Sequence, residues 1–67
     1  MAAPQTEIVA VHHAADQRII RLDGHLYLQH KDAGRWWPPS AELQDTRPMP
    51  ECYLAAFRRF PAWQVTS

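Results

Sequence analysis

The chain has 67 residues, and its seven Lys and Arg balance seven Asp and Glu, so the formal net charge is zero with neutral histidines. This length excludes a second domain, and a single domain of this size buries only about 60% of the surface that its unfolded chain exposes. Balanced charge excludes a whole-molecule field that would draw the protein to nucleic acid or an anionic membrane. The single cysteine, Cys52, excludes an internal disulfide, so we expect an aromatic core or a partner to supply stability.

Localisation follows from what the sequence lacks. No apolar run approaches the ~20 residues of a membrane span, and the N-terminus has no basic region followed by an apolar one. A lone thiol agrees with a reducing compartment. We therefore expect a cytoplasmic protein that does not enter a membrane.

The first predicted element is a strand over 6–14. Residues 1–5 carry no periodic pattern and are predicted to be frayed and disordered. The strand is indicated by Ile8, Val9 and Val11, which are β-branched and nearly alternate. A short polar turn follows it, which is enough for an antiparallel connection.

A β-hairpin is predicted around Asp23-Gly24, and two registers are open. A two-residue loop pairs Leu22 with His25 and mixes polar and apolar side chains on both faces. A three-residue loop pairs Ile20 with Leu26 and gives one coherent apolar face, which a sheet covered by a single helix needs. We therefore favour the three-residue loop. The opposite face, wet or used for binding, then carries Ile19, Arg21, His25, Tyr27 and Gln29.

Shorter elements are predicted over the middle of the chain. Residues 31–34 read as a turn, and Arg35–Trp37 forms a short strand or extends the third strand before prolines end the pairing. Ser40 is a candidate N-cap for one helical turn that reaches Leu43.

The main helix is predicted from Pro50 to Phe60, because proline suits the first helical position and Pro61 cannot continue a helix. A helical wheel places Tyr53, Phe57 and Phe60 in one narrow core-facing stripe, which is flanked by Leu54 and Ala56. Trp63 is expected to cover one end of the core. The predicted fold class is α+β, a single domain with a three-stranded antiparallel β-meander and one C-terminal α-helix packed on one face.

Catalytic and metal chemistry find little support in the residues present. His12 and His13 are neighbours in a strand and point to opposite faces, so they cannot both reach one ion. Cys52 borders the apolar stripe of the helix, where a structural thiol is expected. We therefore predict no enzyme activity, no metal site and no cofactor.

Candidate recognition residues lie elsewhere. Trp36 and Trp37 stand beside two prolines, and neighbouring side chains of an extended segment point opposite ways, so one indole can enter the core while the other stays outside. An exposed Trp is a typical anchor for a protein partner. The alternative is that the prolines stack on both rings and bury them. The full set of predicted partner-binding residues is Trp36, Trp37, Tyr27, Arg21, Arg58 and Arg59.

One family resemblance rests on the same region. The segment Gly34-Arg-Trp-Trp-Pro38, a loop, a helix opened by Glu51-Cys52 and the later Trp63 together resemble the small MbtH-like activators of adenylation enzymes. The resemblance covers about half of the chain. The Asn-x-Glu and Ser-Leu-Trp-Pro elements of that family are absent, and an extra strand precedes the match, so its function is not carried over.

The predicted function is that of a non-enzymatic protein-interaction or regulatory module, of the kind found as phage- or plasmid-type bacterial regulators. The alternative is a nucleic-acid-binding module that uses Arg58 and Arg59 with Arg18 and Arg21, because basic and aromatic side chains together bind phosphates and bases. A homodimer through an edge strand or through the Tyr27 face is a further expectation.

Overall fold

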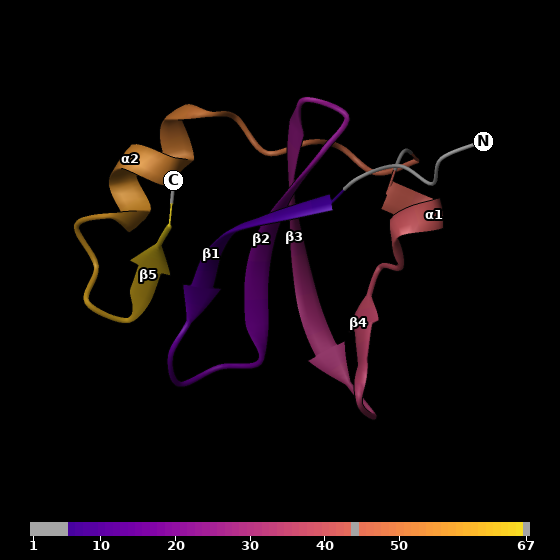
Figure 1. Cartoon of the computed structure of the whole chain (residues 1–67), viewed down its shortest axis with the longest axis horizontal. Helices are drawn as coiled ribbons and strands as arrows, with labels where there is room; N and C mark the ends of the chain where they lie inside the picture. Colours follow the sequence, from indigo (N-terminus) through magenta and orange to yellow (C-terminus); the bar gives the residue numbers. More distant parts are fainter. Residues whose placement is uncertain (1–5, 44, 67) are drawn as a thin grey trace.

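The computed structural model describes residues 6–43 and 45–66, which form a five-stranded antiparallel sheet with two short helices (Figure 1). The strand order in the sheet is β4-β3-β2-β1-β5. The elements in chain order are β1 (Thr6–His12), β2 (Gln17–Leu22), β3 (His25–Asp32), β4 (Arg35–Trp37), α1 (Ser40–Leu43), α2 (Cys52–Phe57) and β5 (Trp63–Val65). The fold is therefore mainly β with some helix.

The predicted meander of three strands is present as the centre of a larger sheet. β4 and β5 extend it at its two ends, so the prediction of only three strands is wrong. The single helix predicted from Pro50 to Phe60 is reduced to α2, and a second helix, α1, follows β4. The prediction of a frayed segment over 1–5 lies outside the described residues.

The turn between β2 and β3 has the register that the sequence argument rejected. Leu22 pairs with His25 and Arg21 with Leu26 across a two-residue loop. Asp23 and Gly24 both have positive φ, 54° and 82°, as a type I′ turn requires. The prediction assumed a sheet buried on one face only. Both faces of β2 are buried, so a mixture of polar and apolar side chains on each face is no obstacle.

Replacing Gly24 with alanine tests this turn. We expect Gly24→Ala to lower the free energy of unfolding by about 1 kcal/mol, because an L side chain is disfavoured at φ +82° even though a Cβ there meets no atom within 4 Å. Urea denaturation followed by tryptophan fluorescence measures the change. An unchanged midpoint would contradict the left-handed turn.

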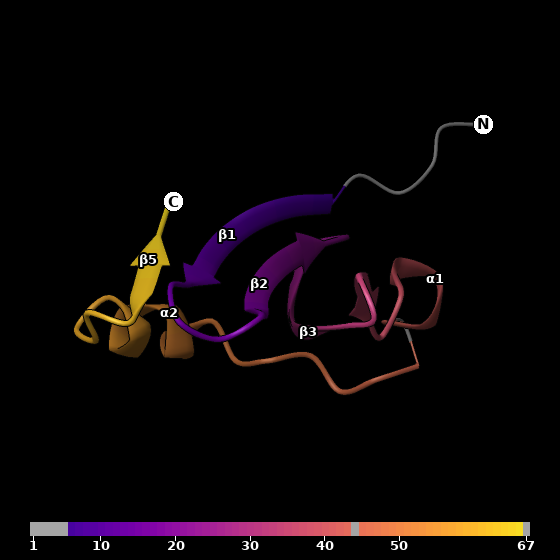
Figure 2. The same ribbon diagram turned by 90° about the horizontal axis from the view of Figure 1, so that it is seen from below.

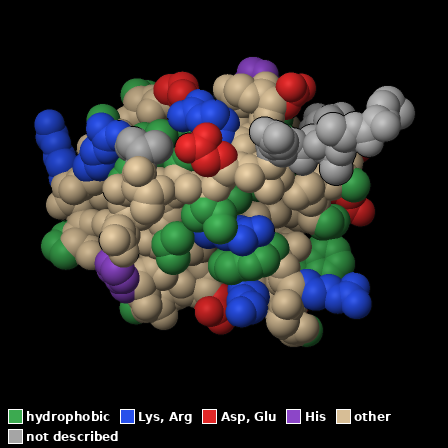
Figure 3. Space-filling view, viewed as in Figure 1, with side chains coloured by type: hydrophobic (Ala, Val, Ile, Leu, Met, Phe, Trp, Pro, Cys, Tyr) green, Lys and Arg blue, Asp and Glu red, His purple; other side chains and the backbone are tan. Residues whose placement is uncertain are grey.

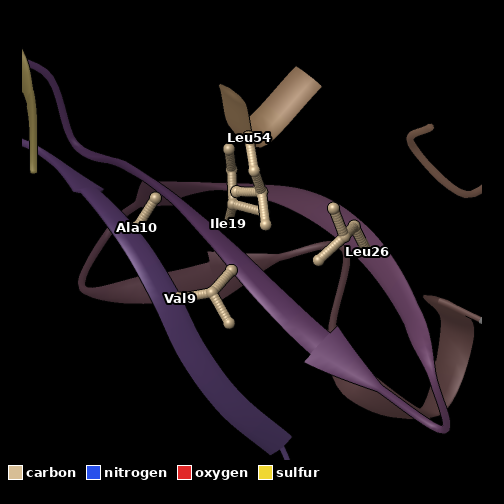
Figure 4. Packing of buried hydrophobic residues seen from close by; sticks show 5 residues of the cluster. All are labelled: Val9, Ala10, Ile19, Leu26 and Leu54. Carbon is tan, nitrogen blue, oxygen red and sulfur yellow. The ribbon is translucent and has the colours of Figure 1, made fainter. Parts of the chain in front are cut away.

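A bulge in β1 brings two successive side chains into the core. Ile8 pairs with Ile20, whereas Ala10 pairs with Ile19, so Val9 is the extra residue. Two residues of the bulged strand then oppose one residue of β2. Val9 and Ala10 are both fully buried, on the same side as Ile19 (Figure 4).

The sheet has a small core on each face, and we name the faces by the helix that packs on each. On the α2 face the buried cluster comprises Val9, Ala10, Ile19, Leu26 and Leu54. On the α1 face it comprises Ile20, Leu22, Tyr27 and Leu43. After α1 the chain passes the open edge of β3, where the Met49 N–H donates to the Leu26 carbonyl at 2.7 Å, and continues into α2 (Figure 2). Because this connection crosses the edge of the sheet, α1 packs on one face and α2 on the other.

The helix α2 meets the sheet through Leu54, at the flank of the predicted stripe, together with Phe57. Leu54 is buried and Phe57 is partly buried against the same cluster, but Tyr53 is 49% and Phe60 55% exposed. The prediction that Tyr53 and Phe60 face the core is therefore wrong. The helix ends at Phe57, so Phe60 lies beyond it, and the ring of Tyr53 contacts Phe57 edge-on, with centroids 6.5 Å apart.

Candidate protein-binding surface

The edge strand β4 carries both neighbouring tryptophans. It follows a tight turn in which Ala33 and Gly34 have φ of 51° and 80°. Trp36 pairs with Lys31 and Trp37 with His30, so the two indoles lie on opposite faces of the sheet. Trp36 is half-buried and Trp37 is 39% exposed. Sequence alternation predicted the opposite directions correctly, but neither ring belongs to a buried apolar cluster.

On the α1 face, Trp36 lies beneath two cations. The guanidinium carbon of Arg18 is 4.1 Å from the centroid of the indole, and the Lys31 Nζ is 5.9 Å from it. These distances fall within the range of cation–π attraction. The indole therefore fixes the position of the Arg18 side chain above β4.

The buried side chain of Gln29 also holds Arg18 in this position. It is 1% exposed, and its Oε1 accepts a hydrogen bond of 2.8 Å from the Arg18 Nε. Its Nε2 donates to the Pro38 carbonyl, also at 2.8 Å. Both ends of this buried amide are thereby satisfied, as a buried polar group requires. Burial lowers the pKa of the Arg18 guanidinium below its ordinary value, because desolvation disfavours the charged form, yet an arginine stays protonated near neutral pH.

On the α2 face, Trp37 borders an uncovered apolar area. His30 stands opposite Trp37, and Leu28, two residues before His30 on the same face, is 43% exposed. Diagonal neighbours in an antiparallel pair lie about 7–8 Å apart, which aromatic side chains can span. Neither Leu28 nor Trp37 belongs to the cluster that α2 covers. In the part of the chain that the structure describes, this half of the α2 face is therefore exposed.

The side chain of Tyr27 is buried, contrary to the predicted exposed position. It is 6% exposed and packs with Ile20, Leu22 and Leu43 on the α1 face. The prediction of a wet Tyr27 face is wrong because it rested on the three-residue loop. Because Tyr27 is buried against α1, it is not exposed for the homodimer contact that was expected through this face.

The predicted arginines are placed on different parts of the fold. Arg21 lies on the α2 face, where its Nη1 forms a salt bridge of 2.7 Å with the Glu51 Oε1. Arg18 precedes it in β2 by three residues and therefore faces the other way. Arg58 and Arg59 follow the end of α2, and both are exposed. The structure thus separates Arg18 from Arg21, which the nucleic-acid alternative combined in one patch.

His12 and Trp63 make structural contacts. The His12 Nδ1 accepts the N–H groups of Ala14 and Ala15, at 3.1 and 2.8 Å, and its ring meets Trp63 edge-on with centroids 5.1 Å apart. Trp63 also packs on Phe57 at 4.8 Å, partly buried against the α2-face cluster, which agrees with its predicted covering role. Cys52 is exposed.

The described residues have no enclosed site. Within 6–43 and 45–66, no group of three or more His, Cys, Asp or Glu side chains could hold a metal ion, and the surface forms no pocket. None of the helices in this part of the chain is long and apolar enough to cross a membrane. The candidate surface is accordingly open, and its side chains stand on strands.

Sequence reasoning missed the contact between Arg18 and Trp36. Each residue was a candidate by itself, but their approach depends on the pairing of β2 with β3 and of β3 with β4. The two-residue loop at Asp23-Gly24, had it been preferred, would have placed Arg18 and Gln29 on one face.

No protein-family model, curated protein or solved structure matches the chain.

Proposed function

We propose that the chain is a small protein-interaction module that binds a segment of another protein along β4. The observation that carries this proposal is the exposed indole of Trp37, which stands on an edge strand beside the exposed Leu28. Trp anchors are enriched among residues that dominate binding energy at protein interfaces. An edge strand also leaves backbone groups unpaired, to which an extended segment can add.

A protein partner fits this surface better than a nucleic acid does. Strands of nucleic acid are bound by tracks of cations along the phosphate backbone. Here Arg21 is engaged by Glu51, and the formal net charge of the chain is zero. Among the described residues, Arg18 and Lys31 are the cations over Trp36, so the cationic area is small and lies next to apolar side chains.

Replacing Trp37 with alanine tests the proposal. We expect Trp37→Ala to weaken partner binding about 30-fold, since truncation of a central Trp anchor costs roughly 2 kcal/mol or more. Folding should stay nearly intact, because the ring belongs to neither buried cluster. The measurement is quantitative capture of proteins from a lysate of the native host on immobilised chain, followed by titration of the captured protein.

Tyr53→Ala is the matched control, because Tyr53 is also an exposed aromatic residue but lies on α2. A protein captured by the wild type and by Tyr53→Ala, but not by Trp37→Ala, supports the proposal. Equal capture by all three chains contradicts it. Binding to random single-stranded DNA whose log affinity falls steeply with log salt would favour the nucleic-acid alternative instead. Self-association, measured by sedimentation, would identify a second copy as the occupant.

A further inference from the structure

Arg18 is held in place on the α1 face by two neighbours, Trp36 and Gln29. Its guanidinium lies over Trp36, its Nε donates to the Gln29 Oε1, and Gln29 is itself fixed by the Pro38 carbonyl. These contacts use the Nε and one flat side of the guanidinium. The two terminal nitrogens make no hydrogen bond within the described residues, so a planar pair of donors is fixed in position and still free to bind.

Among the described residues, no carboxylate forms a salt bridge with the guanidinium of Arg18. Across 6–43 and 45–66 the salt bridge that forms joins Arg21 to Glu51, and it lies on the opposite face of the sheet. Lys31 approaches the same indole and adds a second positive charge. Partial burial removes water from Arg18, which strengthens any electrostatic interaction made there.

We propose that Arg18, Lys31 and Trp36 form a carboxylate-binding site, which takes an acidic side chain of the bound protein segment. The two terminal nitrogens of a guanidinium match the two oxygens of a carboxylate, and such bidentate pairs are stronger than neutral hydrogen bonds. Lys31 adds an ammonium beside them. This inference rests on the proposed protein-binding function and names the chemistry of the partner.

Apolar side chains lie on the β1 side of Arg18, on the same face of the sheet. Val11 stands opposite Arg18 on β1, and Ile8 lies on the same face; both side chains are exposed. Figure 3 shows hydrophobic side chains gathered over the strands at the centre of the view, with a Lys or Arg side chain between two of them. One guanidinium among apolar neighbours suits a single carboxylate in an amphipathic segment. A phosphate backbone would need further cations along its length.

The test uses two short peptides that differ at one position. Acetylated and amidated Thr-Val-Glu-Val-Thr is titrated into the ¹⁵N-labelled chain near neutral pH, and Thr-Val-Gln-Val-Thr serves as the matched neutral probe. Inorganic phosphate and a thymidine oligonucleotide are further titrants. The signals followed are the Nε–H of Arg18 and the indole N–H of Trp36. We expect the glutamate peptide to shift both signals, with a Kd on the order of 1 mM for one charged contact, and the glutamine peptide to shift neither.

Variants locate the site. Arg18→Gln should weaken binding of the glutamate peptide by about 10-fold or more. Arg18→Lys should also weaken it, because an ammonium lacks the planar fork and the stacking surface, and this variant covers the case in which Arg18→Gln fails to fold. Arg35→Gln removes the same charge from β4, but Arg35 pairs with Asp32 on the other face, so it should leave binding unchanged.

Several outcomes would overturn the inference. Equal shifts with the glutamine peptide would show that charge is not recognised, and tighter binding of phosphate or of the oligonucleotide would make the site one for phosphate. If Arg35→Gln weakens binding of the glutamate peptide as much as Arg18→Gln does, binding depends on the net charge of the chain and not on a site at Arg18. If Trp37→Ala abolishes partner capture while neither peptide shifts Arg18, the protein-binding function stands and only the carboxylate site fails.

Discussion

Ile19→Ala and Ile20→Ala should each lower the free energy of unfolding by about 2–5 kcal/mol. The two residues are neighbours in β2, and each is fully buried. Ile19 packs in the α2-face cluster and Ile20 in the α1-face cluster, so each truncation removes methyl groups from a different core. Small domains are stable by only several kcal/mol, and either variant is therefore expected to populate the unfolded state substantially.

Urea denaturation at low temperature measures both variants. Ile8→Ala is the matched control, because it is the same substitution on the neighbouring strand at a side chain that is 47% exposed. It should lower the free energy of unfolding by less than about 1 kcal/mol. A sheet buried on one face would give one large and one small loss for the pair in β2. That result would contradict the two-sided core and restore the three-residue loop.

Local sequence signals predicted the positions of the turns, but they did not predict the strand register that the turn between β2 and β3 sets. Asp23-Gly24 and Gly34 mark chain reversals, and Pro38 ends pairing, because each residue type limits the backbone at its own position. The register of the hairpin depends instead on what covers each face. Leu43 of α1 covers one face and Leu54 of α2 the other, and no local pattern in β2 reports either.

The unpredicted strand β5 and the shortened helix α2 also depend on parts of the chain outside each element. The strand β5 exists because Trp63 pairs with His12 and Val65 with Ala10, near the other end of the chain. Three residues with one polar side chain between two apolar ones are too short a pattern to predict such a partner. The limited length of α2 likewise follows from the turn that leads into β5, where the Trp63 N–H donates to the Phe60 carbonyl.

The candidate site was predictable in part. Alternation placed Trp36 and Trp37 on opposite faces before any register was known. It could not say which ring is open, because the cover on Trp36 is the side chain of Arg18 from a strand two positions away in the sheet. Long side chains that bury their stems and rings against one another leave no periodic signal in the sequence.

Leu54→Ala should cost about 2 kcal/mol of unfolding free energy, whereas Tyr53→Ala should cost under about 1 kcal/mol. Leu54 is 7% exposed and is the α2 side chain buried in the α2-face cluster, while the neighbouring Tyr53 is 49% exposed. Phe57 is only partly buried, so Phe57→Ala should fall between the two, below the ~3–5 kcal/mol of a fully buried ring. The order of the three losses therefore reports the orientation of the helix.

Thermal and urea unfolding of the three variants give this order directly. A core-facing stripe of Tyr53 and Phe57 would make Tyr53→Ala the costly change and Leu54→Ala the mild one, which would contradict the helix orientation described here. The same set bears on binding, because Tyr53→Ala is the control for Trp37→Ala. If Tyr53→Ala unfolds the chain, its retention of the partner can no longer be expected, and an exposed residue off β4 such as Phe60 must replace it.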